Sequence, residues 1–127
     1  SYNLFIGDNV YIANGCWLNA MGRLEIQDEV VFGPYVVIST LQHNFVNNSV
    51  RFGGSKADAV SIGKGSWLAA HSSIKCGVKL GKGNLIAANA FVTKSTTDYK
   101  IYGGVPALEI KKMKNNENDS DVFYKRK

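Results

Sequence analysis

An apolar side chain recurs at every sixth residue through most of this sequence. Twelve positions keep this register, apart from a two-residue insertion near Leu24–Glu25 and a longer interruption after Ile38. These positions are Ile6, Ile12, Leu18, Ile26, Phe32, Ile38, Ile62, Leu68, Ile74, Leu80, Ile86 and Val92. A period of six matches neither the 3.6-residue period of an α-helix nor the two-residue alternation of a β-strand. It suits a short strand and a tight corner, repeated three times in each triangular coil. Twelve units therefore predict four coils of a parallel β-helix, in which neighbouring coils bury one another's apolar faces.

The residues between the apolar positions suit tight corners. The residue that follows the repeated position is often small, as at Gly7 and Ala13. Glycine and asparagine tolerate the positive φ that such corners require, and we expect this role for Gly15, Asn84 and Asn89. A set of ordinary antiparallel strands is the alternative, and twelve apolar positions in one register argue against it.

The interruption of the repeat begins at a histidine. The unit "ISTLQH" ends at His43, and the next positions in register are Asn44, Val50 and Lys56, of which two are polar. Residues 44–61 include "NNS" and "FGGSKAD", compositions typical of loops, and the repeat then resumes. We therefore predict a protruding loop over 44–61, with His43 at the corner where the loop leaves the coils. A loop held between rigid elements is a usual position for binding or catalytic groups.

The bulk properties indicate one domain without a membrane span. The 127 residues suffice for one hydrophobic core, and the longest apolar run, "VVFGPYVVI", falls short of the roughly 20 residues that a membrane helix needs. No signal-peptide pattern is present, so we expect a cytoplasmic location, with Cys16 and Cys76 as free thiols in a reducing compartment. The sequence opens on Ser1 rather than on Met, from which we expect a fragment or a processed chain.

The net charge of +5 is modest and dispersed. Residues 108–127 carry six basic and four acidic side chains, which is +2, so +3 remains for residues 1–107. No basic stripe with interleaved aromatic residues is present, which disfavours nucleic-acid binding, whereas a small phosphate-bearing ligand suits this charge. After the repeats, "GGVPALEIKKMK" predicts a tight turn and a short basic helix, and "NNENDSDVFYKRK" predicts a polar tail. We therefore divide the chain into a β-helix domain over 1–107 and a short basic helix with a polar tail over 108–127.

Three motifs in a set order carry a resemblance to a known family. They are "STLQH" before the loop, "VSIGKGSWLAAHSSIKCGVKLGKGNLIAANAFVTK" after it, and "GGVPA" beyond the repeats. Over residues 5–110 the chain resembles the hexapeptide-repeat acyltransferase superfamily, in particular galactoside and maltose O-acetyltransferases and related polysaccharide O-acetyltransferases. The expected fold class is all-β: a left-handed parallel β-helix of about four coils with one protruding loop and a short C-terminal helix. The left hand is implied by the resemblance alone, as is a homotrimer with active sites between neighbouring subunits.

The resemblance implies an acetyl-CoA-dependent O-acetyltransferase that acts on a hydroxyl of a sugar or a polysaccharide precursor, without a metal. His43 is then the general base that takes the proton of the acceptor hydroxyl, and imidazole suits this task because its ordinary pKa is about 6.5. The backbone N–H of Ala70 matches the donor that stabilises the oxyanion of the tetrahedral intermediate. Transfer is direct, in a ternary complex, since no Ser or Cys beside His43 resembles an activated nucleophile.

The resemblance also implies contacts with the donor, acetyl-CoA. Small side chains leave room for the pantetheine arm, and the threonine–lysine pair of "FVTK" contacts the phosphate-bearing end. The implied cofactor-binding positions are Gly33, Ala70, Ala88, Thr93, Lys94 and Lys111. Lys111 is included because relatives often carry an arginine where this chain has Leu108, and Lys111 or Lys112 could supply that phosphate contact instead.

Further positions concern the acceptor and the surroundings of the base. Relatives contact the acceptor with an asparagine from an earlier coil; the strict offset falls on Ala13, and Asn14 beside it is the candidate. Arg51 lies in the loop where relatives often hold an arginine, which either fastens the loop or contacts the acceptor. Coil stacking suggests Glu25 as a group that orients the His43 imidazole. His71 matches a histidine that is common in relatives, and we assign it a role in packing or at an interface rather than in catalysis.

Two alternative functions stay open. A xenobiotic O-acetyltransferase of the same fold would perform the same chemistry on an antibiotic hydroxyl. A non-catalytic β-helix scaffold would not bind CoA, so CoA binding distinguishes it from both enzymes. A γ-class carbonic anhydrase is disfavoured, because its zinc site needs three histidines and this sequence has two.

Overall fold

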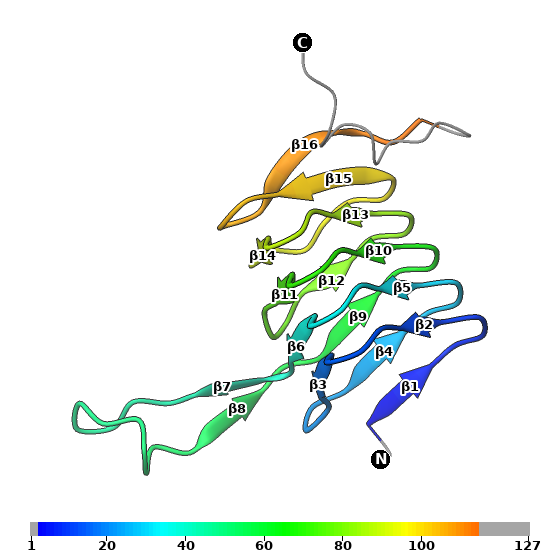
Figure 1. Cartoon of the computed structure of the whole chain (residues 1–127). Helices are drawn as coiled ribbons and strands as arrows, with labels where there is room; N and C mark the ends of the chain where they lie inside the picture. The colour runs from blue at the N-terminus through cyan, green and yellow to red at the C-terminus, as the bar shows by residue number, and fades with distance from the viewer. Residues whose placement is uncertain (1–2, 115–127) are drawn as a thin grey trace.

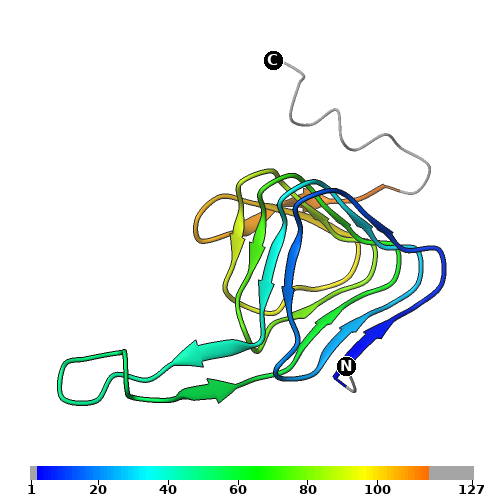
Figure 2. The same cartoon turned by 60° about the horizontal axis from the view of Figure 1, so that its bottom comes forward.

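Three β-sheets form the faces of a triangular prism in this computed structural model, which describes residues 3–114 (Figure 1). Each turn of the chain adds one short strand to each sheet, and Figure 2 shows the turns stacked nearly end on. We name the sheets faces A, B and C. Face A contains β1 (Leu4–Ile6), β4 (Leu24–Ile26), β9 (Val60–Ile62) and β12 (Lys79–Leu80). Face B contains β2 (Tyr11–Ile12), β5 (Val31–Phe32), β10 (Trp67–Leu68), β13 (Leu85–Ile86), β15 (Lys100–Gly103) and β16 (Leu108–Lys112). Face C contains β3 (Trp17–Asn19), β6 (Val37–Ser39), β11 (Ser73–Ile74) and β14 (Phe91–Val92).

These strands make four complete coils, as the repeat predicts. Coil 1 is β1 to β3, coil 2 is β4 to β6, coil 3 is β9 to β11 and coil 4 is β12 to β14. β15 adds one further strand on face B. A separate two-stranded arm lies between coils 2 and 3 and contains β7 (Leu41–His43) and β8 (Ser55–Ala57).

The strand registers place the twelve repeated residues in three columns, one behind each face. Face A stacks Ile6, Ile26, Ile62 and Leu80; face B stacks Ile12, Phe32, Leu68 and Ile86; face C stacks Leu18, Ile38, Ile74 and Val92. Every column residue of coils 2 to 4 is buried. Ile6 and Ile12 in coil 1 are 48% and 37% exposed, because within residues 3–114 a coil covers them on one side only. Each buried side chain of this size contributes about 1.5–3 kcal/mol relative to an exposed one, so the columns hold the coils together.

The corners between faces B and C use positive φ. Gly15 and Asn89 have φ values of 79° and 63°, as the sequence predicts. The same corner position in coils 2 and 3 holds Tyr35 and His71, with φ values of 59° and 61°. Left-handed backbone is uncommon for side chains of this size, and Glu29 and Tyr99 adopt it at other corners, with φ values of 63° and 58°.

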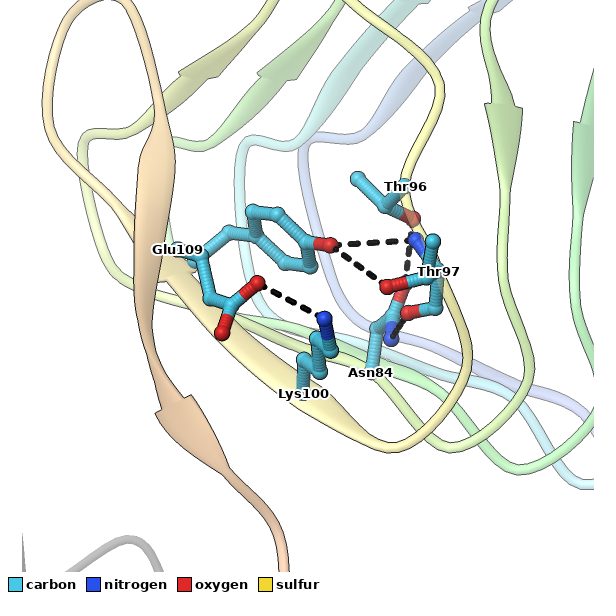
Figure 3. Close-up of polar contacts among 6 residues, drawn as sticks. Asn84, Thr96, Thr97, Lys100 and Glu109 are labelled. Atoms are coloured by element: carbon cyan, nitrogen blue, oxygen red, sulfur yellow. Dashed lines mark hydrogen bonds and ion pairs between the residues drawn. The ribbon is translucent and has the colours of Figure 1, made fainter.

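A polar cluster replaces apolar stacking where the chain passes from coil 4 to β15 (Figure 3). The prediction that Asn84 adopts a positive φ is wrong, because its buried side chain is held by hydrogen bonds instead. Its Nδ2 donates to the Thr97 carbonyl over 2.8 Å, and its Oδ1 accepts from the Thr96 hydroxyl. The Thr97 N–H donates to the Tyr102 hydroxyl over 3.0 Å. These bonds hold residues 93–99, which connect face C to face B.

The C-terminal segment forms a strand where the sequence predicts a short helix, so this prediction is wrong. β16 runs antiparallel to β15, the last strand that the coils add to face B. A sheet edge offers unpaired N–H and C=O groups to a following segment, and this pairing overrides the helix propensity of the Leu, Glu and Lys residues in β16. Lys100 Nζ donates to Glu109 Oε1 over 2.8 Å across the pair (Figure 3). The predicted tail over 115–127 lies outside the described residues.

Candidate functional site

A hairpin arm leaves the prism between face C of coil 2 and face A of coil 3 (Figures 1 and 2). Its strands β7 and β8 are antiparallel, with His43 opposite Ser55. The arm agrees with the protruding element of the expected fold, but the bounds differ from 44–61. β7 precedes that range, and β9 already rejoins face A at Val60. His43 is therefore an exposed residue of the arm itself rather than a corner residue of a coil.

Thr40 connects the root of the arm to the coils. Its buried hydroxyl donates to the Asn19 carbonyl over 3.0 Å and accepts from the Gly22 N–H over 2.8 Å. Its own carbonyl accepts from the Asp58 N–H over 2.8 Å. Gly22 leaves the necessary space, because a Cβ there would lie 3.2 Å from the Thr40 Cβ and 3.3 Å from the Ala57 Cβ. The turn between β3 and β4, which contains the two extra residues, therefore contacts the root of the arm. The two irregularities of the repeat thus pack against each other.

A groove of about 420 Å³ runs between β7 and the outer side of face C. Val37 and Phe91 are among its apolar lining residues. On the arm side, Gln42 Oε1 accepts a hydrogen bond from Lys75 Nζ over 3.5 Å and from Cys76 Sγ over 3.7 Å. These contacts tie the first strand of the arm to coil 3. The sequence did not indicate Gln42, since it lies outside the six-residue register of apolar positions.

His43 follows Gln42 in β7, so its side chain projects from the opposite side of the strand. Within residues 3–114 the imidazole has no hydrogen-bond or ion-pair partner. Glu25 was predicted to orient this ring, but it lies on face A, with its Oε1 3.8 Å from Arg23 Nη2. The exposed imidazole is therefore available to a hydroxyl group that binds beside the arm.

Small residues line the opposite edge of face C, where face B turns into it. Asn14, Gly33, Ala70 and Ala88 lie in this corner region in coils 1 to 4. Gly33 touches the backbone of the next coil, where a Cβ at position 33 would be 2.8 Å from the Ala70 nitrogen. The Ala70 N–H has no hydrogen-bond acceptor within residues 3–114. Gly33 therefore leaves this amide uncovered, and an unpaired backbone N–H is suited to stabilise an oxyanion.

Two aromatic rings adjoin this amide, and the sequence did not indicate their contact. The rings of Tyr35 and His71 are stacked, with centroids 5.3 Å apart and planes inclined by 11°. Both residues occupy the corner position that Gly15 fills in coil 1 and Asn89 in coil 4. An alignment of the repeat units by corner position would have placed them in one column. Their contact agrees with a packing role for His71.

The other predicted positions lie away from these small residues. Thr93 and Lys94 follow β14 at the edge between faces C and A, which is also the edge from which the arm leaves in coil 2. Lys111 lies on β16, at the end of face B. Arg51 lies in the arm, with its guanidinium carbon 4.9 Å from the centroid of the Phe52 ring.

The structure thus divides most of the predicted site between the two edges of face C. His43, Arg51, Thr93 and Lys94 belong to the edge between faces C and A, and Asn14, Gly33, Ala70 and Ala88 belong to the edge between faces B and C. The two edges are roughly 15 Å apart, since about five residues of extended chain separate them at ~3.3 Å each. One chain therefore does not bring the His43 imidazole to the Ala70 amide.

Among residues 3–114, no group of three or more His, Cys, Asp or Glu side chains is placed to hold a metal ion. In the same part of the chain, no helix is long and apolar enough to cross a membrane. Cys16 and Cys76 are both free thiols.

Several known proteins are similar to this chain, although no family model matches it. Galactoside O-acetyltransferase of Lactococcus lactis is 31% identical over 126 residues, which cover 94% of this chain and 59% of that relative. A maltose O-acetyltransferase from Clostridium difficile 630 superimposes with a TM-score of 0.84 at 28% identity, over 90% of this chain and 61% of the other. A galactoside acetyltransferase in complex with coenzyme A gives a TM-score of 0.82 at 28% identity, over 94% and 58%.

These comparisons establish the fold and show how much of each relative the chain covers. They identify the coil stack as a left-handed parallel β-helix, as the resemblance of the sequence implied. The chain spans 57% to 60% of the length of the curated relatives that it matches.

Proposed function

We propose that this chain, which is similar to galactoside and maltose O-acetyltransferases, is a hexapeptide-repeat acyltransferase that transfers the acetyl group of acetyl-CoA to a hydroxyl of a sugar or a polysaccharide precursor. One observation carries the proposal: Gly33 leaves the Ala70 amide uncovered, with no acceptor for it within residues 3–114. A side chain at 33 would close this position. The equivalent amides of Asn14 and Ala88 also have no acceptor within residues 3–114, so the glycine beside it is what distinguishes the Ala70 amide. Acyl transfer needs such a donor, because charge develops on the carbonyl oxygen of the thioester.

In the proposed mechanism His43 acts as the general base. Its neutral imidazole takes the proton of the acceptor hydroxyl as the hydroxyl oxygen attacks the thioester carbonyl carbon. The Ala70 N–H donates a hydrogen bond to the oxyanion of the tetrahedral intermediate. When the carbon–sulfur bond breaks, the departing thiolate of CoA takes the proton from the imidazolium, so that an acetyl ester and CoA leave and the base is regenerated.

The donor substrate would lie along the edge between faces B and C. Gly33, Ala70 and Ala88 present little side-chain volume there, which suits the pantetheine arm. We assign the phosphate-bearing end of CoA to Lys111 of the same chain and to Thr93 and Lys94 of a neighbouring copy, because Thr93 and Lys94 lie at the other edge of face C. The lysines suit this role because an ammonium group binds phosphate as a point charge. The net charge of +5 favours the approach of this polyanionic substrate.

The acceptor would lie between His43 and the thioester. We assign Asn14 and Arg51 to acceptor contacts. The exposed position of His43 on the arm leaves space beside it for a substrate as bulky as a glycan. A sugar hydroxyl is favoured over an antibiotic hydroxyl by the named relatives, which are a galactoside and a maltose O-acetyltransferase.

We further propose that the active enzyme is a homotrimer. The His43 and Ala70 edges of one chain are separated by face C, so a complete site needs the first edge of one copy against the second edge of another. Closed threefold symmetry makes three such sites at once. Apolar side chains on the outer faces favour such contacts, since large exposed patches of this kind mark interaction surfaces. These side chains are Tyr11, Val31 and Trp67 on face B and Trp17, Val37 and Phe91 on face C.

We place the reaction in the cytoplasm, in the assembly of a polysaccharide or its precursor. Two free thiols, Cys16 and Cys76, suit a reducing compartment.

Calorimetric titration with acetyl-CoA, beside a measurement of molecular mass in solution, tests the proposal. We expect saturable binding of one acetyl-CoA per chain in a trimer, followed by release of CoA when methyl galactoside or maltose is added. A folded trimer that binds no acetyl-CoA at millimolar concentration would instead be a non-catalytic scaffold. Transfer to an aminoglycoside or chloramphenicol hydroxyl, but to no sugar, would reassign the acceptor to xenobiotics.

A further inference from the structure

Tyr35 and His71 adopt a backbone conformation that large side chains usually avoid. Gly15, Tyr35, His71 and Asn89 occupy one corner position in coils 1 to 4, with φ values of 79°, 59°, 61° and 63°. Glycine and asparagine are the residues expected there, because left-handed backbone crowds a Cβ against the following carbonyl. Burial in the core does not offset the cost of this backbone conformation, since Tyr35 is 51% exposed and His71 is also exposed.

The contacts of the two rings explain why they occupy these corners. The Tyr35 ring covers Gly15, where a Cβ would lie 2.3 Å from the Tyr35 Cε1. The His71 ring stacks on Tyr35, with centroids 5.3 Å apart and planes inclined by 11°. The stack therefore spans three consecutive coils at one edge of the prism.

The stack also brackets the uncovered amide of Ala70. His71 is the residue after Ala70, and its own N–H donates to the Pro34 carbonyl over 3.0 Å. Gly33, on the other side of Pro34 from Tyr35, is the residue whose missing side chain leaves the Ala70 nitrogen uncovered. The ring contact and the Pro34 hydrogen bond thus join the coil 2 corner to the coil 3 corner, which contains the amide.

We propose that Tyr35 and His71 are positioning residues, which hold the Ala70 N–H in the direction that oxyanion stabilisation requires. The expected effect on catalysis rests on the proposed function. The expected effect on the order of the Ala70 amide does not depend on it. Neither ring touches the reacting atoms. His71 acts through the stacking surface of its ring and not through proton transfer. Its role therefore differs from that of His43.

A matched set of variants separates this role from a general effect on folding. Tyr35→Asn and His71→Asn remove the stack but keep a residue that tolerates positive φ. Tyr35→Phe and His71→Phe keep an aromatic ring. Tyr99→Asn is the control, because Tyr99 also has a positive φ (58°) and covers a glycine, Gly83, at a corner outside the proposed site.

The first measurement is kcat with acetyl-CoA and methyl galactoside or maltose, beside the affinity for CoA. We expect the stack-removing variants to lower kcat about tenfold, less than the 10²–10³-fold that follows loss of a whole oxyanion donor, with CoA affinity nearly unchanged. The ring-keeping variants and Tyr99→Asn should retain kcat within about twofold, and the double variant should be no slower than either single one, since both remove the same contact. Additive losses, or CoA affinity that falls in parallel with kcat, would overturn the proposal.

The second measurement needs no activity. Nitrogen-15 relaxation should give the Ala70 amide an order parameter of about 0.85 in the wild type and below about 0.6 in Tyr35→Asn. An equally ordered amide in Tyr35→Asn would overturn the positioning role even in an active enzyme. If the wild type neither binds CoA nor transfers acetyl, the proposed function fails, and the relaxation data alone decide whether the stack holds this amide.

Discussion

Coils 2 to 4 bury the apolar side chains at their repeated positions, whereas the arm exposes its large apolar side chains. Phe32 in coil 2 is 0% exposed, and Phe52 in the arm is 88% exposed. Both segments contain aromatic and aliphatic residues, so apolar content alone does not distinguish them. The difference is register: Phe32 lies in a column with apolar partners in the neighbouring coils, and Phe52 has no such column. The comparison teaches that the six-residue repeat determines which apolar residues form the core, while departures from it provide exposed groups.

The two regions meet at a small number of contacts. Thr40 joins the arm to Asn19 and Gly22, where the chain turns from coil 1 to coil 2, and Gln42 joins it to coil 3. The base candidate, His43, lies one residue beyond these anchors. The exposed candidate base thus projects from a strand that hydrogen bonds fix to the coils. The following predictions test this division between a stabilising repeat and a functional arm.

The largest expected effect is on catalysis and arises in the arm. His43→Ala should lower kcat about 10²–10⁴-fold, which is the usual contribution of a general base. CoA affinity and thermal stability should change little, because the imidazole has no partner within residues 3–114. Steady-state kinetics and calorimetry check this. A fully active His43→Ala enzyme would show that the base lies elsewhere.

The next effect concerns stability and compares the two phenylalanines. Phe32→Ala should lower the free energy of unfolding by about 3–5 kcal/mol, because it leaves a cavity in the column of face B. Phe52→Ala should change it by less than about 0.5 kcal/mol, as exposed substitutions usually do. Denaturant unfolding of both variants makes the comparison. Equal losses would mean that the arm, too, is buried in the folded state.

A third effect tests the uncovered amide. Gly33→Ala places a Cβ against the Ala70 nitrogen and should lower kcat about 10²–10³-fold, as loss of an oxyanion donor does. Gly65→Asn is the matched control, because Gly65 also lies at a corner, has a φ of 76° and has no atom within 4 Å of an added Cβ. That variant should retain full activity. Unchanged kinetics in Gly33→Ala would remove the Ala70 amide from the mechanism.

A fourth effect tests the root of the arm. Thr40→Val leaves the Gly22 N–H without its acceptor and should destabilise the protein by about 1–3 kcal/mol. Hydrogen exchange should become faster at Gly22, whereas the amides of coil 4 should exchange as before. Exchange that accelerates equally in coil 4 would indicate global unfolding rather than a local anchor.

The smallest effect concerns the C-terminal hairpin. The hydrogen bond from Lys100 to Glu109 raises the pKa of Lys100 above its ordinary 10.5, against a smaller effect of desolvation. A raised pKa in the folded state means that this pair stabilises the fold fully below pH 10.5 and loses its contribution as the pH rises through the folded value. Lys100→Met should therefore lower Tm slightly at pH 7, less in high salt, and not at all at strongly alkaline pH. A pH-independent difference in Tm would contradict this origin.

The repeat made the coils predictable, because twelve positions in one register leave a single way to stack them. The segment from Leu108 to Lys112 was not predictable in the same way. Its residues favour a helix locally, and only the free edge of β15 makes a strand the better choice. Asn84 was predicted to be a corner residue for a similar reason. Its hydrogen bonds to Thr96 and Thr97 depend on the path of the chain after coil 4, which the local sequence does not show.

The sequence proposes the members of the candidate site but does not indicate their arrangement. Family motifs indicated His43 and Ala70, and nothing in their spacing states that they lie at opposite edges of face C. Gln42 and Tyr35 were missed because each acts through a neighbour in the next coil, and local sequence does not display such contacts. Aligning residues by corner position, rather than by apolar position, would have brought Tyr35 and His71 together.

The central claim is that His43 of one copy and the Ala70 amide of another form one site. Mixed oligomers of His43→Ala and Gly33→Ala test it directly, because each variant alone lacks one of the two groups. If the groups come from different copies, random mixing at equal amounts restores about one quarter of the wild-type activity, since one site in four then pairs two intact edges. If both groups come from the same chain, every site remains defective and no activity returns, which would contradict the account.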